Sequence, residues 1–111
     1  MTERSVPLIF FPEDIIGTAV SWLGVPRDEL FSKSRSPRAL LGRRAVWHVL
    51  HYTATMSYSE IGRYFNRDHT TIMDGVSKIT RKMANDEMML RLVMTLATQS
   101  QERAYERIRS A

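Results

Sequence analysis

Four short polar residues in a row carry the side chains of this sequence best suited to chemistry; they are Asp68, His69, Thr70 and Thr71. An Asp can accept a hydrogen bond from a cytosine amino group, a Thr can offer its hydroxyl to a base or its methyl to thymine, and a His can do either. Taken singly, each residue also fits an ordinary role, such as a helix N-cap for Asp68. Taken together, they indicate contacts with the base edges of DNA.

The same residues make a poor catalytic site. His69 stands beside Asp68, but no third group at a recognisable spacing could orient the imidazole or stabilise an oxyanion. The chain has no Cys and three His, and only His48 and His51 share an i, i+3 spacing. Zinc sites need thiolate or imidazole ligands at suitable spacings. We therefore expect no enzyme activity, no metal and no cofactor.

Positive charge gathers before this polar group. The chain carries 16 Lys and Arg against 12 Asp and Glu, a formal net charge of +4. The excess lies in residues 27–67, whose basic side chains are Arg27, Lys33, Arg35, Arg38, Arg43, Arg44, Arg63 and Arg67 and whose acidic ones are Asp28, Glu29 and Glu60. Such clustering suits a surface that neutralises phosphates. A solvated charged face is the alternative explanation.

No apolar run in the sequence approaches the length of a membrane span. The apolar stretch from Val6 to Phe11 is short, is interrupted by Pro7 and does not resemble a signal peptide. We expect a cytoplasmic, nucleoid-associated protein of bacterial or phage type that makes no membrane contact.

Helical signals predict an all-α fold that positions the polar group. Periodicity indicates a helix from Pro12 to Gly24, a short helix over 26–31, a longer helix from about Pro37 to 53–56, and a last helix that opens at 85–87. In the last helix the apolar face is expected to comprise Met88, Leu92, Val93 and Leu96. The segment 32–38 is predicted to be a basic surface loop.

The stretch from Ser57 to Ile79 has the form of a helix-turn-helix. Ser57 and Glu60 make a capping box, which predicts a short helix to about Phe65. Asn66 and Arg67 form a tight turn, and Asp68 caps the next helix. In that helix the buried residues should be Ile72, Val76 and Ile79, and the exposed ones Thr70, Asp74 and Ser77.

The stretch Arg67-Asp68-His69-Thr70-Thr71-Ile72, followed by Lys78-Ile79, resembles the C-terminal DNA-binding domain of the bacterial replication initiator DnaA. The similarity of order and spacing extends from about Pro12 to Met83. It implies a compact, multi-helix, Trp-repressor-like domain with a helix-turn-helix. We divide the chain into an N-terminal tail with an apolar plug (1–11), the DNA-binding domain (12–96) and a polar C-terminal helical extension (97–111).

The resemblance also implies a role for individual residues. Asp68, His69 and Thr70 would contact bases in the major groove, and Arg35 would enter the neighbouring minor groove. The residues expected at phosphates are Thr71, Lys33, Arg43, Arg67 and Lys78. Three departures from the family pattern bear on whether the family's target is kept. A turn with Asn66 alone would tilt the recognition helix, whereas the carboxylate of Asp74 on the exposed face and a basic loop with Pro37 and few arginines predict weaker binding.

Two functional hypotheses remain. The first is a stand-alone protein that binds double-stranded DNA at initiator-type boxes and regulates replication initiation or transcription. Since the sequence has no Gly-x-x-x-x-Gly-Lys-Ser/Thr loop, we do not expect it to melt an origin alone. The second is an interaction module whose DNA binding is weakened and whose partner is the replication initiator or one of its regulators.

Overall fold

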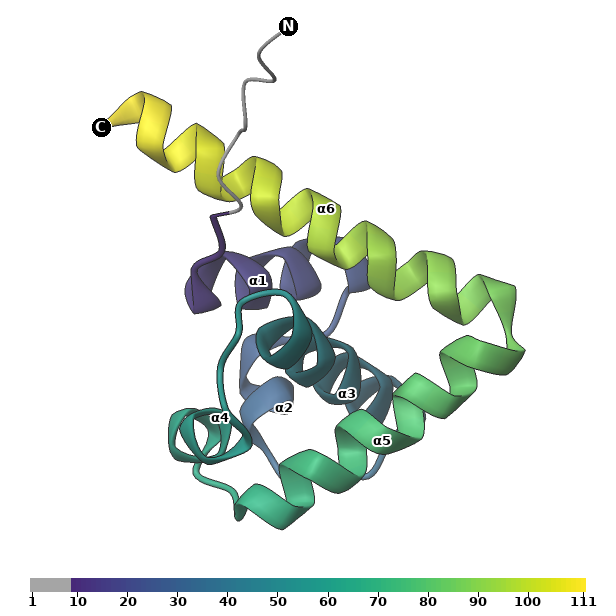
Figure 1. Ribbon diagram of the computed structural model, residues 1–111. Coiled ribbons are helices and arrows are strands. Elements are labelled where there is room, and N and C mark those ends of the chain that lie inside the picture. The colour runs from purple at the N-terminus through teal and green to yellow at the C-terminus, as the bar shows by residue number, and fades with distance from the viewer. Residues whose placement is uncertain (1–8) are drawn as a thin grey trace, which may run out of the picture.

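The computed structural model describes residues 9–111, and every regular element in this range is a helix (Figure 1). The elements are α1 (Pro12–Thr18), η1 (Ala19–Leu23), α2 (Arg27–Phe31), α3 (Pro37–Tyr52), α4 (Tyr58–Phe65), α5 (His69–Asn85) and α6 (Glu87–Ser110). The all-α prediction is confirmed. Within the described residues, no helix has the length and apolar character needed to cross a membrane.

The first predicted helix forms as α1 and its continuation η1, a π-helical turn. Pro12 lies in the first turn, where its missing N–H costs no hydrogen bond, and Glu13 and Asp14 favour the positive end of the helix dipole. Ile15 is fully buried. The helix ends at Gly24, whose φ of 71° is in the left-handed region that glycine adopts without strain.

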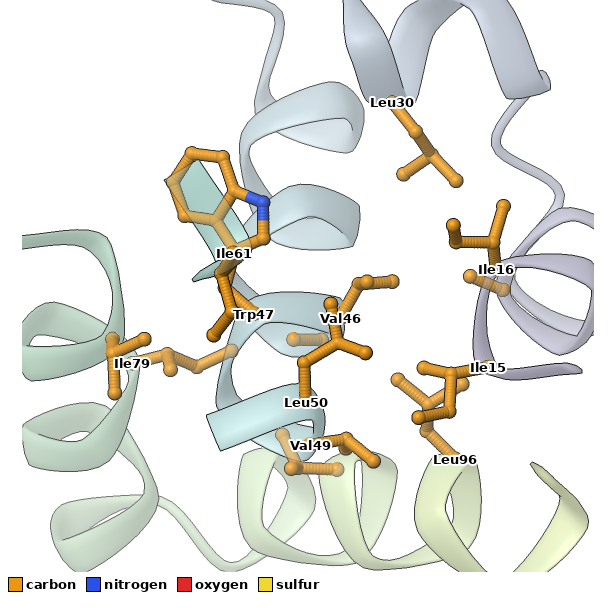
Figure 2. Close-up of a cluster of buried hydrophobic side chains, with 14 of the residues drawn as sticks. Ile15, Ile16, Leu30, Val46, Trp47, Val49, Leu50, Ile61, Ile79 and Leu96 are labelled. Atoms are coloured by element: carbon orange, nitrogen blue, oxygen red, sulfur yellow. The ribbon is translucent and has the colours of Figure 1, made fainter. Parts of the chain in front are cut away.

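The core surrounds α3, which packs against every other helix of the described chain. Its side chains Val46, Val49 and Leu50 are fully buried. Figure 2 shows them facing buried side chains of the other helices, namely Ile15, Ile16, Leu30, Ile61, Ile79 and Leu96. This single core fixes α4 and α5 against α3 and therefore sets the orientation of the helix-turn-helix.

The last helix, α6, runs across position 97 without a break and lies over α1 (Figure 1). Ser100 and Ala104 are fully buried in this second half. Near its end, Arg107 donates to the buried carboxylate of Asp14 at 2.6 Å. The residues expected to form a polar extension therefore pack against α1.

The apolar face of α6 differs from the expected one at its start. Met88 is 77% exposed and Met89 only 8%. Asp86 caps the helix by accepting hydrogen bonds from the backbone N–H groups of both. With the helix starting there, residues 89, 93, 96, 100 and 104 fall on the inner face. The inclusion of Met88 in the buried face was wrong, whereas Val93 and Leu96 are buried as predicted.

Part of the expected N-terminal plug lies in the described range. Phe10 is partly buried against the core, while Phe11 is 38% exposed. Ile9 is also partly buried, and Leu8 lies outside the described residues. Among the residues of this apolar segment that the structure describes, Phe10 is the one that packs against the core.

Candidate nucleic-acid interface

The turn between α4 and α5 is fixed by its own backbone. Asn66 has φ 55° and ψ 51°, in the left-handed region that Asn tolerates better than most residues. The N–H of Arg67 donates to the carbonyl of Gly62 at 2.8 Å, and the N–H of Asn66 to that of Arg63 at 3.4 Å. This pair of bonds is a Schellman motif. A Cβ at Gly62 would lie 2.5 Å from the carbonyl oxygen of Arg67, so glycine is required for this approach.

The capping box at the start of α4 forms as predicted. Glu60 accepts from the N–H of Ser57 at 2.8 Å, and Ser57 accepts from the N–H of Glu60 at 3.1 Å. The hydrogen bonds from Ser57 lower the pKa of the Glu60 carboxyl. Ile61 and Phe65 anchor α4 in the core. The capping box thus fixes the start of α4, and the turn at Asn66 fixes its end.

The tip of α5 carries the expected polar group. Asp68 caps the helix: its Oδ1 accepts from the N–H of Thr70 at 2.8 Å and from the Thr70 hydroxyl at 2.7 Å. These bonds lower the pKa of the Asp68 carboxyl. The Nδ1 of His69 lies 3.4 Å from the same oxygen. All of these contacts go to Oδ1, and both side chains are well exposed, at 67% for Asp68 and 58% for His69.

The two faces of α5 divide as predicted. Ile72, Val76 and Ile79 are buried, and Thr70, Asp74 and Ser77 are exposed. Gly75 lies against the ring of Trp47 on α3, where a Cβ would come within 2.8 Å of the ring carbons. The glycine therefore allows α5 to lie close to α3.

A basic groove of about 260 Å³ lies between the loop after α2, residues 40–47 of α3 and residues 71–78 of α5. It is lined by Lys33, Arg35, Leu40, Arg43, Arg44, Trp47, Arg67, Thr71, Asp74, Gly75 and Lys78. The groove contains every predicted minor-groove and phosphate residue. Asp68 and His69 line an adjoining shallow hollow with Arg63, and Thr70 is exposed on the same tip. The fold thus brings all nine predicted site residues to one side of the helix-turn-helix.

The position of Arg43 does not suit the expected phosphate contact. It is 3% exposed. Its Nη1 donates to the carbonyls of Glu29 and Ser32 at 3.0 Å each, and its Nη2 donates to the carbonyl of Ser34. Burial lowers its pKa, followed by the charges of the neighbouring arginines, Arg67 first. The guanidinium is therefore engaged with the basic loop.

Arg67 also points inward in part. Its Nη2 donates to the carbonyl of Ser32, and its guanidinium carbon lies 5.9 Å from the ring centroid of Trp47. Lys78 is paired with Asp74 at 3.0 Å, whereas Lys33, Arg35 and Thr71 are exposed. Of the predicted phosphate residues, Lys33, Thr71 and Lys78 have the exposure that such a contact needs, and Arg35 has the exposure needed for its predicted minor-groove contact.

Two basic residues near the groove were not among the predicted site residues, although Arg44 belongs to the basic cluster of residues 27–67. Arg44 is half-buried and lines both this groove and a neighbouring hollow, which Lys82 also lines. Neither has an ion-pair partner within residues 9–111. The spacing of four between Lys78 and Lys82 could have identified Lys82 as a member of the same helix face. No signal in the sequence separates Arg44 from its neighbour Arg43.

An exposed, capped helix tip after a tight turn, with a basic groove beside it, defines a helix-turn-helix domain of the DNA-binding class. The family described as the bacterial dnaA protein helix-turn-helix matches residues 12–79, and the chain belongs to this family.

Curated relatives agree with this assignment. The chain is 28% identical to the chromosomal replication initiator protein DnaA of Deinococcus deserti, over 86% of the chain and 23% of the relative. The corresponding values for DnaA of Deinococcus radiodurans are 29%, 84% and 20%. For DnaA of Clavibacter sepedonicus they are 33%, 68% and 16%. The chain thus spans less than a quarter of the length of these relatives.

Proposed function

We propose that this chain binds double-stranded DNA sequence-specifically at initiator-box-like sites and regulates replication initiation, transcription or both. The observation that carries the proposal is the tip of α5, where capped polar side chains stand exposed next to a basic groove. A tip that enters the major groove would be held there by phosphate contacts on the groove walls. The names of the DnaA relatives support the link to replication.

The base contacts would come from Asp68, His69 and Thr70. Since the capping bonds go to Oδ1 of Asp68, its Oδ2 is the oxygen that can accept from a cytosine amino group. The Thr70 hydroxyl donates to Asp68, so Thr70 would contribute its methyl or the lone pairs of its oxygen. His69 is exposed beside them and can serve as donor or acceptor.

Contacts with the backbone and the minor groove would come from the groove residues. Arg35 projects from the loop and would enter an adjacent narrow minor groove, where negative potential is concentrated. Thr71, Lys33 and Lys78 would contact phosphates, with a further contribution from Arg67. Asp74 opposes this, because its carboxylate pairs with Lys78 and faces the same groove.

A mobility-shift titration tests the proposal. The probe is a duplex enriched by this protein from a random-sequence pool, and the control is the same duplex scrambled. We expect tight binding to the enriched duplex and a log-log salt slope of about −0.9 for each neutralised phosphate. Equal affinity for the scrambled duplex contradicts sequence-specific binding, and a flat salt profile contradicts the proposed phosphate contacts.

The second candidate is a module that binds the replication initiator or its regulators, with weakened DNA binding. The observation in its favour is an apolar hollow on the α6 side, lined by Trp22, Met88, Met89 and Leu92, of which Trp22 is 45% exposed. The same titration separates the candidates, because this module would show no preference for the enriched duplex.

A further inference from the structure

The basic loop between α2 and α3 is held from its inner side. The buried guanidinium of Arg43 donates hydrogen bonds to three backbone carbonyls. Two of them, from Ser32 and Ser34, belong to the loop, and the third, from Glu29, lies just before it in α2. Inside the loop, the N–H of Ser34 donates to the hydroxyl of Ser32 at 3.1 Å, and the N–H of Ser36 to that of Ser34 at 3.3 Å. The segment has no helix, but its backbone is fixed at successive positions.

A second guanidinium reaches the same loop from the helix-turn-helix. Arg67 donates to the carbonyl of Ser32, which also accepts from Arg43. The backbone N–H of Arg67 closes the turn by donating to Gly62, and the next residue, Asp68, caps α5. One residue therefore contacts both the loop that carries Arg35 and the turn that sets the tip of α5.

Burial and the nearby positive charges both oppose a charged guanidinium at the position of Arg43. Arg43 is buried close to Arg67, Arg44 and Arg35, and their charges add to burial in lowering its pKa. Charge-assisted bonds to carbonyls offset that repulsion. A lysine could carry the charge, but a single ammonium cannot reproduce the planar fork with which Arg43 bonds three carbonyls.

We infer that Arg43 and Arg67 are positioning residues that join the basic loop and the tip of α5 into one DNA-contacting unit. Through them, the minor-groove contact of Arg35 depends on the same backbone that presents Asp68, His69 and Thr70. The inference rests on the proposed function and adds that the contacts with the major groove and with the minor groove of DNA are coupled. Neither guanidinium needs to touch DNA for this role.

The first test measures the free protein. Hydrogen exchange at the backbone amides of Ser34 and Ser36 is compared among wild type, Arg43→Lys, Arg67→Lys and the control Arg44→Lys. Arg44 lines the same groove, and among the described residues its guanidinium donates a hydrogen bond to no backbone carbonyl. We expect faster exchange at both amides in the first two variants, with native circular dichroism, and no change in the control. Unchanged exchange in Arg67→Lys overturns the inference even if Arg43→Lys fails to fold.

The second test is a double-mutant cycle of Arg35→Ala with Arg67→Lys, using the enriched duplex. If the loop is positioned through Arg67, the loss caused by Arg35→Ala should shrink by about threefold or more in the Arg67→Lys background. The salt slope should stay the same in Arg67→Lys, because the charge is kept. Additive losses overturn the coupling while leaving the proposed function intact. Failure of the wild type to bind the duplex at all refutes the proposed function, and the exchange experiment still decides the positioning role.

Discussion

The tip of α5 and the basic loop face the same side of the molecule but are fixed in different ways. At the tip, Asp68 accepts a hydrogen bond from Thr70, two residues away. The preceding turn is closed by the bond from the N–H of Arg67 to the carbonyl of Gly62, five residues earlier. In the loop, Ser32 accepts from Arg43 and Arg67, which lie 11 and 35 positions further along the chain. The tip is therefore a product of local sequence, and the loop is a product of the tertiary fold.

The difference separates residues that contact DNA from residues that prepare the contact. A polar residue in a locally fixed segment can remain exposed, as His69 does. The basic loop has only the short contacts from Ser34 to Ser32 and from Ser36 to Ser34 within itself. Its carbonyls therefore also accept hydrogen bonds from arginines that the sequence analysis had assigned to phosphate. Mutations at the two regions should consequently differ in whether they alter specificity alone or stability as well.

The largest effect is expected where the local turn itself is broken, in Gly62→Ala. The new Cβ would lie 2.5 Å from the carbonyl oxygen of Arg67, and neither backbone can move without opening the turn. We expect a loss of about 1–3 kcal/mol in the free energy of unfolding, together with loss of specific binding. Urea unfolding and the mobility shift measure the two. The exposed substitution Ser77→Ala is the control, and a fully stable Gly62→Ala would show that the turn is not constrained in this way.

His69→Ala and Thr70→Ala probe the tip and leave in place the backbone bond from Thr70 to the capping carboxylate of Asp68. Each should weaken binding to the enriched duplex by about 1–3 kcal/mol, the usual value of a good base contact. Binding to the scrambled duplex should change little, because phosphate contacts are retained. Competition titrations with both duplexes measure the ratio. Equal losses on both duplexes would assign these side chains to the backbone instead of the bases.

The cap of α5 makes a prediction about pH. Hydrogen bonds from Thr70 depress the pKa of Asp68 in the folded protein below its ordinary value of 3.8. The stabilisation is therefore fully present above pH 3.8 and is lost as pH falls through the folded pKa. Asp68→Asn keeps a cap that does not titrate. The stability advantage of wild type over Asp68→Asn should thus decline in acid.

Urea unfolding at a series of pH values measures this difference. Asp68→Ala serves as the uncapped reference and should be less stable than both wild type and Asp68→Asn at neutral pH. Glu60→Gln controls for the other capping carboxylate whose pKa is lowered. A constant difference between wild type and Asp68→Asn down to strong acid would contradict the capping role of the carboxylate.

The smallest effect is expected at the rim of the groove. Asp74→Asn should release Lys78 from its exposed ion pair and remove a negative charge near phosphates. We expect DNA affinity to rise by about 0.3–1 kcal/mol on specific and scrambled duplexes alike. The salt slope should steepen by about 0.9 if Lys78 gains a phosphate. Lower affinity in Asp74→Asn would instead indicate that Asp74 positions Lys78 productively.

The sequence allowed the parts with local determinants to be predicted. The Ser57–Glu60 box, the left-handed Asn66, the Asp68 cap and the buried face of α5 all depend on residues within a turn or two of each other. Such determinants also identified the family. The buried position of Arg43 could not be predicted, because Arg43 and Arg44 are identical in type and only the packing of α2 and its loop against α3 decides which one is enclosed. The start of α6 was misjudged for a related reason, since the cap at Asp86 sets which of Met88 and Met89 faces inward.

Footprinting of both grooves on the enriched duplex tests the central claim most directly. Major-groove methylation interference and minor-groove cleavage protection are measured with wild type, His69→Ala and Arg35→Ala. We predict interference in one major groove and protection in the adjacent minor groove. His69→Ala should weaken the major-groove interference at the base that His69 contacts, and Arg35→Ala should remove the minor-groove protection. A footprint confined to one groove, or one that neither substitution alters, would contradict an interface built from the tip of α5 and the basic loop.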